Sequence, residues 1–259
     1  MIKVCAIGDS HLSAFKYGID TSPPEFDVTV FACRNDYAAD LVLRGNSLVA
    51  RSSELESQLA QFSGGKTRID FDSYDQFVVI GFNFGIVPVG FVYRRYFCDS
   101  MPGAADGRYL LSDDCFTAVC RNDLENTECL RIALAIRSVT RKPISVVASP
   151  NIAEGCTEDE LPKWLPPFHL AEQRGDATIL ARVLRGACAD LAARNNLAVI
   201  PPLKEVAVSG VFNHQKFSLL SDGVEASSLE DKIGKLFHGN SLYGSILVQH
   251  IFDAIRINT

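Results

Sequence analysis

The sequence contains no dense run of lysine or arginine, and its acidic residues outnumber its basic ones. There are 25 Lys and Arg residues against 31 Asp and Glu, which gives a formal net charge of −6 at pH 7. Proteins that bind nucleic acids need a concentrated basic surface to neutralise phosphates. We therefore expect no nucleic acid among the partners of this chain.

Long apolar segments are also missing. No window is apolar for long enough to span a bilayer, and the start, Met1 to Val4, becomes polar too early for a signal peptide. These two features predict a cytoplasmic protein with no membrane partner.

The eight cysteines are scattered and form neither a Cys-x-x-Cys pair nor a zinc-binding pattern with histidines. We interpret most of them as small buried apolar residues. Cys115 and Cys120 lie closest together, and a metal or redox role for this pair is the less favoured alternative. We expect no metal and no cofactor.

Internal repeats, low-complexity tracts and linkers are absent as well. The apolar content of 47% and the charged content of 22% are ordinary for a globular protein. We predict a single domain over residues 1–259, with an irregular, proline-rich insertion around 150–170. In that insertion Trp164 and Phe168 could pin the segment to the core, which we favour, or stack on a sugar.

Apolar, β-branched segments alternate along the chain with segments of helical spacing, which is typical of a parallel α/β sheet. The predicted strands are 2–7, 26–32, 77–81, 143–148 and 197–200. Helices are predicted from the end of the first strand to about residue 17, and over 54–62, 115–139, 172–195 and 245–257. This pattern predicts an α/β, three-layer αβα sandwich with a five-stranded, mainly parallel, flavodoxin-like sheet.

The first predicted strand ends in Gly8-Asp9-Ser10, where a helix begins. The carboxyl ends of parallel strands are where ligands bind in such sheets, because the turns there expose side chains and unpaired N–H groups. An Asp-Ser pair before a helix is also typical of an ordinary N-cap. Ser10 therefore fits both a structural and a functional role.

This turn resembles the opening block of the SGNH (GDSL-type) hydrolase superfamily, in which the serine is the nucleophile. Here His11 and Leu12 stand where leucine is commoner. The loop before the last predicted helix, His238-Gly239-Asn240-Ser241-Leu242-Tyr243-Gly244, is similar to the block that carries the base. The resemblance implies that Ser10 is the nucleophile and His238 the general base.

Two shorter segments resemble the blocks that form the oxyanion hole. Gly45 stands where the glycine after the second strand is expected, and Asn83 occupies the Gly-x-Asn block that begins at Gly81. The resemblance implies an oxyanion hole built from Ser10, Gly45 and Asn83. The alternatives are that Gly45 only makes a turn and that Asn83 only caps a strand end. Phe84 replaces the aspartate that usually follows the asparagine.

The final block departs from the family at one position, because Lys235 replaces the aspartate usually found three residues before the histidine. A lysine cannot orient an imidazole or stabilise its cation. The orienting group could be a backbone carbonyl, a carboxylate or missing; the candidate carboxylates are Asp222, Glu230 and Asp231. We expect the side chain of His11 to point away from the site, and His169, His214 and His250 lack the position before the last helix.

Together these features predict a serine esterase that hydrolyses a small acyl ester, such as an O-acetyl group on a carbohydrate or secondary metabolite. A serine hydroxyl needs a neutral imidazole within hydrogen-bond reach for this reaction. Two alternatives remain open: an O-acyltransferase that acts on a saccharide, and a non-catalytic module that binds a glycan or a partner. The oligomeric state cannot be inferred from the sequence.

Overall fold

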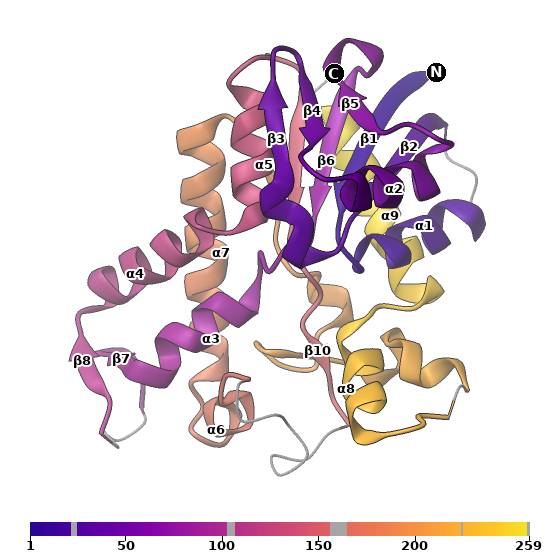
Figure 1. Ribbon diagram of the computed structural model, residues 1–259. Helices are drawn as coiled ribbons and strands as arrows, with labels where there is room; N and C mark the ends of the chain where they lie inside the picture. The colour runs from indigo at the N-terminus through magenta and orange to yellow at the C-terminus, as the bar shows by residue number, and fades with distance from the viewer. Residues whose placement is uncertain (22–24, 103–106, 156–164, 224, 258–259) are drawn as a thin grey trace.

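A five-stranded sheet forms the centre of the computed structural model, which describes residues 1–21, 25–102, 107–155, 165–223 and 225–257 (Figure 1). Its strands are β1 (Ile2–Gly8), β2 (Phe26–Ala32), β6 (Gln76–Ile80), β9 (Ile144–Val147) and β11 (Ala198–Ile200). They lie in the order β11-β9-β6-β1-β2, and every pairing is parallel. The flavodoxin-like sheet predicted from the sequence is thereby confirmed.

Helices cover both faces of this sheet. One face is covered by α1 (Leu12–Thr21) and α9 (Ser241–Ile257), and the other by α2 (Ser53–Ser63), α5 (Glu128–Arg137) and α7 (Ala177–Asn195). Because both faces are covered, β6 is buried along its whole length, which explains its continuous apolar sequence. The predicted three-layer sandwich is confirmed.

The two helices of the first layer, α1 and α9, cross at a pair of glycines. A Cβ added at Gly244 would overlap the carbonyl oxygen of Ala14, and one added at Gly18 would overlap the backbone of Gly244. Only glycine at both positions allows so close an approach. The crossing brings the segment before α9 next to the turn before α1 at the carboxyl edge of the sheet.

Two predicted helices are each divided in the structure. The segment 115–139 forms α4 (Asp113–Glu125) and α5, because the Thr127 hydroxyl donates to the Leu124 carbonyl (2.8 Å) and accepts from the Leu130 N–H (3.4 Å). This hydroxyl caps a new helix. Residues 172–195 likewise divide between α6 (Phe168–Gln173) and α7, with Gly175 at φ +75° between them.

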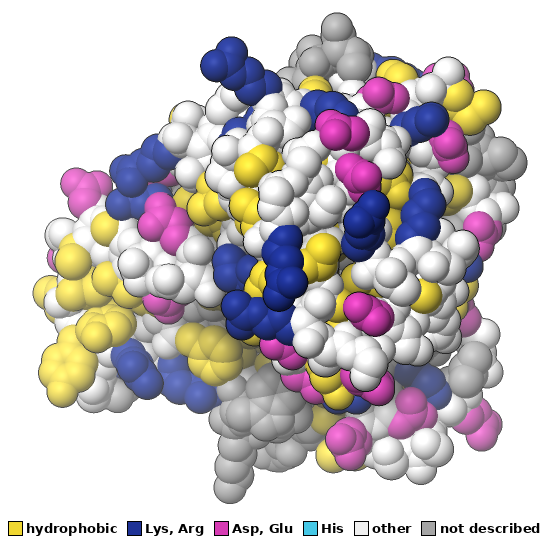
Figure 2. Space-filling model, turned by 45° about the horizontal axis from the view of Figure 1, so that its top comes forward, with side chains coloured by type: hydrophobic (Ala, Val, Ile, Leu, Met, Phe, Trp, Pro, Cys, Tyr) yellow, Lys and Arg dark blue, Asp and Glu magenta, His cyan; other side chains and the backbone are white. Residues whose placement is uncertain are grey.

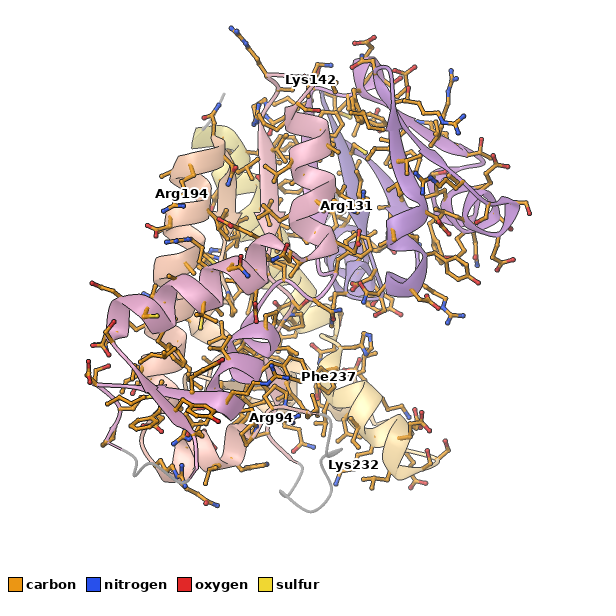
Figure 3. All side chains as sticks on the ribbon, turned by 60° about the vertical axis from the view of Figure 1, so that its left-hand side comes forward. Arg94, Arg131, Lys142, Arg194, Lys232 and Phe237 are labelled. Atoms are coloured by element: carbon orange, nitrogen blue, oxygen red, sulfur yellow. The ribbon has the colours of Figure 1, made fainter. Side chains whose placement is uncertain are left out.

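A second, antiparallel sheet was not predicted. It consists of β3 (Leu41–Arg44), β4 (Ser47–Ala50) and β5 (Arg68–Asp70). The guanidinium of Arg131, labelled in Figure 3, donates to the backbone carbonyls of Ala38 and Leu41, which fixes the start of this sheet against α5. This sheet is inserted between β2 and α2, after the short turn η1 (Asn35–Asp40). The insertion moves Gly45 away from the loop that follows β2.

The remaining elements lie mostly beyond the carboxyl edge of the central sheet, in the lower half of Figure 1. The helices among them are α3 (Ile86–Arg95) and α8 (Leu229–Phe237), and the strands are β7 (Tyr96–Cys98), β8 (Tyr109–Leu111), β10 (Ile152–Ala153) and β12 (Phe212–Asn213). Short 3₁₀ turns are η1 (Asn35–Asp40), η2 (Phe71–Ser73), η3 (Lys204–Val206), η4 (Gln215–Phe217) and η5 (Leu219–Asp222).

The proline-rich insertion is described only in part, since Trp164 lies outside the described residues. Phe168, at the start of α6, is fully buried and packs edge-to-face against Phe212. The prediction that this phenylalanine pins the segment to the core is confirmed.

Two surface properties bear on the partners expected from the sequence. On the face shown in Figure 2, Lys and Arg side chains are interspersed with Asp and Glu. Within the described segments, every helix is too short or too polar to cross a membrane.

Candidate active site

Ser10 and His238 meet at the carboxyl edge of the sheet although 228 positions separate them in the chain. The Ser10 Oγ and His238 Nε2 atoms are 2.8 Å apart, which is hydrogen-bond distance. Ser10 lies in the turn that joins β1 to α1, and its side chain is exposed. The contact favours the functional interpretation of this serine over a simple helix cap.

The other ring nitrogen of His238 faces a backbone carbonyl. His238 Nδ1 lies 2.6 Å from the carbonyl oxygen of Gly234, one of the last four residues of α8, whose carbonyls have no partner within the helix. A carbonyl oxygen can only accept a hydrogen bond, so the proton resides on Nδ1. This leaves the lone pair of Nε2 directed at the Ser10 hydroxyl.

Of the orienting groups considered from the sequence, the backbone carbonyl is therefore the one in place. The Asp231 carboxylate pairs with Lys235 Nζ at 2.9 Å, and the Asp222 carboxylate accepts from the Asn240 amide at 3.0 Å. The carboxyl-terminal end of a helix carries partial negative charge that stabilises a nearby cation. In Figure 3, Phe237 marks the end of α8 from which His238 continues.

The loop that carries His238 is held by a buried amide. Asn240 is 3% exposed; its Nδ2 donates to the Lys216 carbonyl (2.9 Å), and its Oδ1 accepts from the Tyr243 N–H (3.1 Å). The carbonyl of His238 itself accepts from the Leu219 N–H at 2.9 Å. Asn240 therefore supports the loop, and its side chain does not reach the serine–histidine pair.

His11 lies against the site, and the prediction that its side chain points elsewhere is wrong. Its ring stacks on that of His238, with centroids 5.2 Å apart and an interplanar angle of 30°. Burial lowers the pKa of His11, the Asp9 carboxylate opposes this shift, and His238 adds to it. His11 is thus neutral at neutral pH and places no second cation beside a protonated His238.

Asp9 ties the serine turn to the turn after β6. Its carboxylate is 6% exposed; Oδ1 accepts from the His11 N–H at 3.0 Å and Oδ2 from the Phe82 N–H at 2.8 Å. A Cβ added at Gly81 would overlap Oδ1 and lie 2.9 Å from the carboxyl carbon. Only a glycine leaves room for this carboxylate, so the glycine of the Gly-x-Asn block positions the nucleophile turn as well.

Asn83 lies in the turn that Asp9 holds. The Phe84 N–H donates to the Gly81 carbonyl at 3.0 Å, and both central residues of the turn have positive φ, +48° at Phe82 and +61° at Asn83. Asparagine tolerates this region, whereas a phenylalanine there is strained. The Asn83 side chain is exposed, and its amide has no partner among the described residues. The structure thus brings the Asn83 turn beside the Ser10 turn.

Gly45 lies at the opposite edge of the sheet, and its prediction as an oxyanion-hole residue is wrong. It forms the turn of the β3–β4 hairpin, and the neighbouring Asn46 carbonyl accepts from the Phe71 N–H at 3.0 Å. The Phe71 carbonyl in turn accepts from Lys142, which precedes β9 (Figure 3). These contacts place Gly45 near the amino ends of the central strands. The loop that directly follows β2 begins with Cys33 and Arg34.

A cavity of about 870 Å³, which was not predicted from the sequence, opens beside Ser10. It lies between α1, the end of β2 and α2, with Ser10 and Asp9 in its lining. Its apolar side chains come from all three elements: Leu12, Tyr17, Val30, Ala32 and Phe62. No sequence motif identifies these residues, because they lie far apart in the chain and their apolar side chains look in the sequence like those of ordinary core residues.

Cys33 also lines this cavity, and its environment argues against a role as nucleophile. Burial, with a contribution from Asp9, raises the pKa of the thiol to about 12. A thiol that stays protonated at neutral pH is a poor nucleophile, which leaves Ser10 as the nucleophile candidate. No group of three His, Cys, Asp or Glu residues that could bind a metal occurs in the described parts of the chain.

Comparisons with known proteins find similarity at the level of three-dimensional structure. No protein-family model and no curated protein matches the chain. A gut microbial diltiazem-metabolizing enzyme is 13% identical at a TM-score of 0.36, over 79% of this chain and 37% of the enzyme. A carbohydrate esterase family 2 enzyme with a carbohydrate-binding domain, from Corynascus thermopiles (Myceliophthora fergusii), is 12% identical at a TM-score of 0.35, over 98% and 66%.

An extracellular lipase from Streptomyces rimosus is 14% identical at a TM-score of 0.36, over 83% of this chain and 92% of the lipase. The chain thus spans about a third and about two thirds of the length of the first two proteins. The resemblance of the chain to the SGNH hydrolases rests on its own features: the serine turn after β1, the strand order of the sheet and the contact between Ser10 and His238.

Proposed function

We propose that this protein is a serine hydrolase that cleaves a carboxylic ester. The observation that carries the proposal is the hydrogen bond between Ser10 Oγ and His238 Nε2, together with the Gly234 carbonyl that fixes the proton on Nδ1. A serine hydroxyl becomes a competent nucleophile when a neutral imidazole accepts its proton. The alcohol component that the resemblance implies is a carbohydrate or a secondary metabolite.

In the proposed reaction, Ser10 Oγ attacks the ester carbonyl carbon while its proton passes to His238 Nε2. The tetrahedral intermediate collapses, the bond to the alcohol oxygen breaks, and His238 returns the proton to the departing alcohol. Water, activated by the same histidine, then hydrolyses the acyl–serine ester. Throughout, the Gly234 carbonyl holds the ring and stabilises the imidazolium that forms.

The negative oxygen of the intermediate needs donors on the side of the serine away from the histidine. We assign the Ser10 N–H and the Asn83 side-chain amide to this role, since both turns are joined through Asp9. Donors that are already oriented stabilise the transition state without reorganisation. Gly45 has no part in this assignment.

The alternative of a non-catalytic binding module was based on Lys235, which replaces the expected aspartate. Lys235 is engaged by the Asp231 carboxylate and by the Glu225 carbonyl, both at 2.9 Å. Its presence therefore does not deprive His238 of an orienting group, which the α8 carbonyl supplies. An acyltransferase would use the same residues, with a saccharide hydroxyl in place of water.

Covalent labelling tests the proposal directly. An organophosphonate that reacts with activated serines should modify Ser10, located by peptide mass spectrometry, and labelling should abolish hydrolysis of p-nitrophenyl butyrate. A sugar acceptor added to the same assay separates hydrolysis from acyl transfer. Absence of label on Ser10, together with absence of hydrolysis, would reject the serine-hydrolase proposal.

Replacing Asn83 by glycine should lower kcat by about 100- to 1000-fold, because one oxyanion donor is lost. Glycine accepts the positive φ of this position, so the turn itself is retained. Asn196, which ends α7 at φ +51°, provides the matched control. The Asn196→Gly variant should retain full activity; an equal loss in both variants would show that the effect is structural.

A further inference from the structure

We propose that the 870 Å³ cavity beside Ser10 binds the acyl chain of the substrate, so that the enzyme prefers esters of medium-length aliphatic acids. The proposal rests on the serine-hydrolase function proposed above and specifies its substrate class. It differs from the small acyl group expected from the sequence.

The tetrahedral intermediate has four substituents, and the structure leaves one direction for the acyl chain. The Ser10 oxygen is the first substituent, and the negative oxygen points to the Ser10 N–H and Asn83. The leaving alcohol must lie at His238 Nε2, because that atom returns the proton. His238 is not in the lining of the large cavity but lines a small one with Pro150 and Asn151. The acyl chain is therefore the substituent that enters the large cavity.

The interior of the cavity suits an aliphatic chain. Its floor is the end of the edge strand β2 and the first turn of α1, where Val30 is 8% exposed and Leu12 is 2% exposed. Two aromatic side chains, Tyr17 on α1 and Phe62 on α2, also line the cavity and are 45% and 46% exposed. Such half-exposed rings gain most from a partner that removes them from water.

Polar groups of the lining come from α1, with Ser13 and Lys16, from the loop after β2 and from α2, and those at the junction of the loop and α2 are paired with one another. Arg34 and Asp36 form an ion pair at 2.8 Å, and the Gln58 Oε1 accepts from the Arg34 N–H at 3.0 Å. Side chains satisfied in this way have less capacity to bind sugar hydroxyls. The apolar floor and the paired polar groups together favour an acyl chain over a saccharide in this cavity.

Two ester series distinguish the acyl from the alcohol side. The first varies the acid (acetate, butyrate, hexanoate, octanoate) with p-nitrophenol as the constant alcohol; the second varies the alcohol from ethyl to octyl in acetate esters. We expect kcat/KM to rise about threefold to fourfold per methylene over the first members of the acyl series, as each methylene leaves water. The alcohol series should change little.

The variant that tests the cavity is Phe62→Ala, and Phe91→Ala is its matched control. Phe91, on α3, is an aromatic side chain of similar exposure (41%) outside the lining of the cavity. We expect Phe62→Ala to reduce the ratio of kcat/KM for octanoate over acetate about tenfold. Phe91→Ala should leave both series as in the wild type.

The possible outcomes separate this inference from the function on which it rests. A flat or falling acyl series with Ser10-dependent hydrolysis would overturn acyl binding while retaining the esterase. A rising alcohol series that Phe62→Ala flattens would assign the cavity to the leaving group and would also overturn the inference. Absence of hydrolysis with every ester, and of phosphonate label on Ser10, would instead reject the proposed function itself.

Discussion

The variants Ser10→Ala and His238→Ala should each lower kcat for p-nitrophenyl ester hydrolysis by about 10⁴-fold or more. Without the serine there is no nucleophile, and without the imidazole the hydroxyl keeps its proton. The two residues act as one unit, because their side chains share a hydrogen bond of 2.8 Å. The double variant should therefore be no slower than either single variant.

His250→Ala is the control for the histidine substitution. His250 lies on α9 and contacts Glu205 at 3.0 Å, remote from the Ser10 hydroxyl, so its removal should leave kcat unchanged. Steady-state kinetics of the four variants give the required rates, and circular dichroism shows whether each is folded. If the losses of the two single variants multiplied in the double variant, serine and histidine would act independently and the mechanism would be wrong.

The second large effect is expected for Gly81→Ala, which should destabilise the protein by about 3 kcal/mol and reduce kcat about 100-fold. The methyl group would overlap the Asp9 carboxylate, and an alanine at φ +84° is strained by about 1–2 kcal/mol even with free space. Displacement of the Asp9 carboxylate breaks its hydrogen bond with the Phe82 N–H, which joins the turn that carries Ser10 to the turn after β6. A shift of about 1 Å in a reacting group is enough for a rate loss of this size.

Gly45→Ala separates backbone strain from the loss of the carboxylate contact. Gly45 also has positive φ, +58°, but nothing lies within 4 Å of an added Cβ. We expect a loss of only about 1 kcal/mol, measured by urea unfolding, with activity unchanged. Equal losses of stability and activity in Gly45→Ala and Gly81→Ala would contradict the role assigned to the Asp9 carboxylate and would reopen the placement of Gly45.

The central sheet could be predicted because its strands are dominated by one local signal. Val78 and Val79 point to opposite faces of the sheet, and both are apolar because both faces are covered. Clear turn residues stand on either side of the strand that they form. The β3–β4 hairpin lacks this signal: each strand has four residues, and only Leu41 and Leu48 are fully buried. The break at Thr127 was missed because the apolar spacing continues across it, and only the hydroxyl contacts end one helix and begin the next.

The site was predictable only where residue identity decides the chemistry. Ser10 and His238 were predicted because each is a residue type able to do the chemistry, a hydroxyl nucleophile and an imidazole base, and because each stands in a segment that resembles a block of the SGNH family. Gly45 was misplaced because a glycine after the second strand is informative only if no element lies between the strand and the glycine, whereas η1 and β3 lie between β2 and Gly45. The ring contact of His11 depends on the packing of α1 against α9, which no local pattern shows.

The orienting group of His238 has a consequence for how this protein loses its activity. The Gly234 carbonyl belongs to the backbone, so no side-chain replacement can delete it. Mutating each carboxylate in turn would therefore identify no third catalytic residue beside Ser10 and His238. What holds the imidazole is the winding of the nine residues of α8. Local melting of that one helix would release the ring while the central sheet stays folded, so we expect inactivation on heating to precede global unfolding.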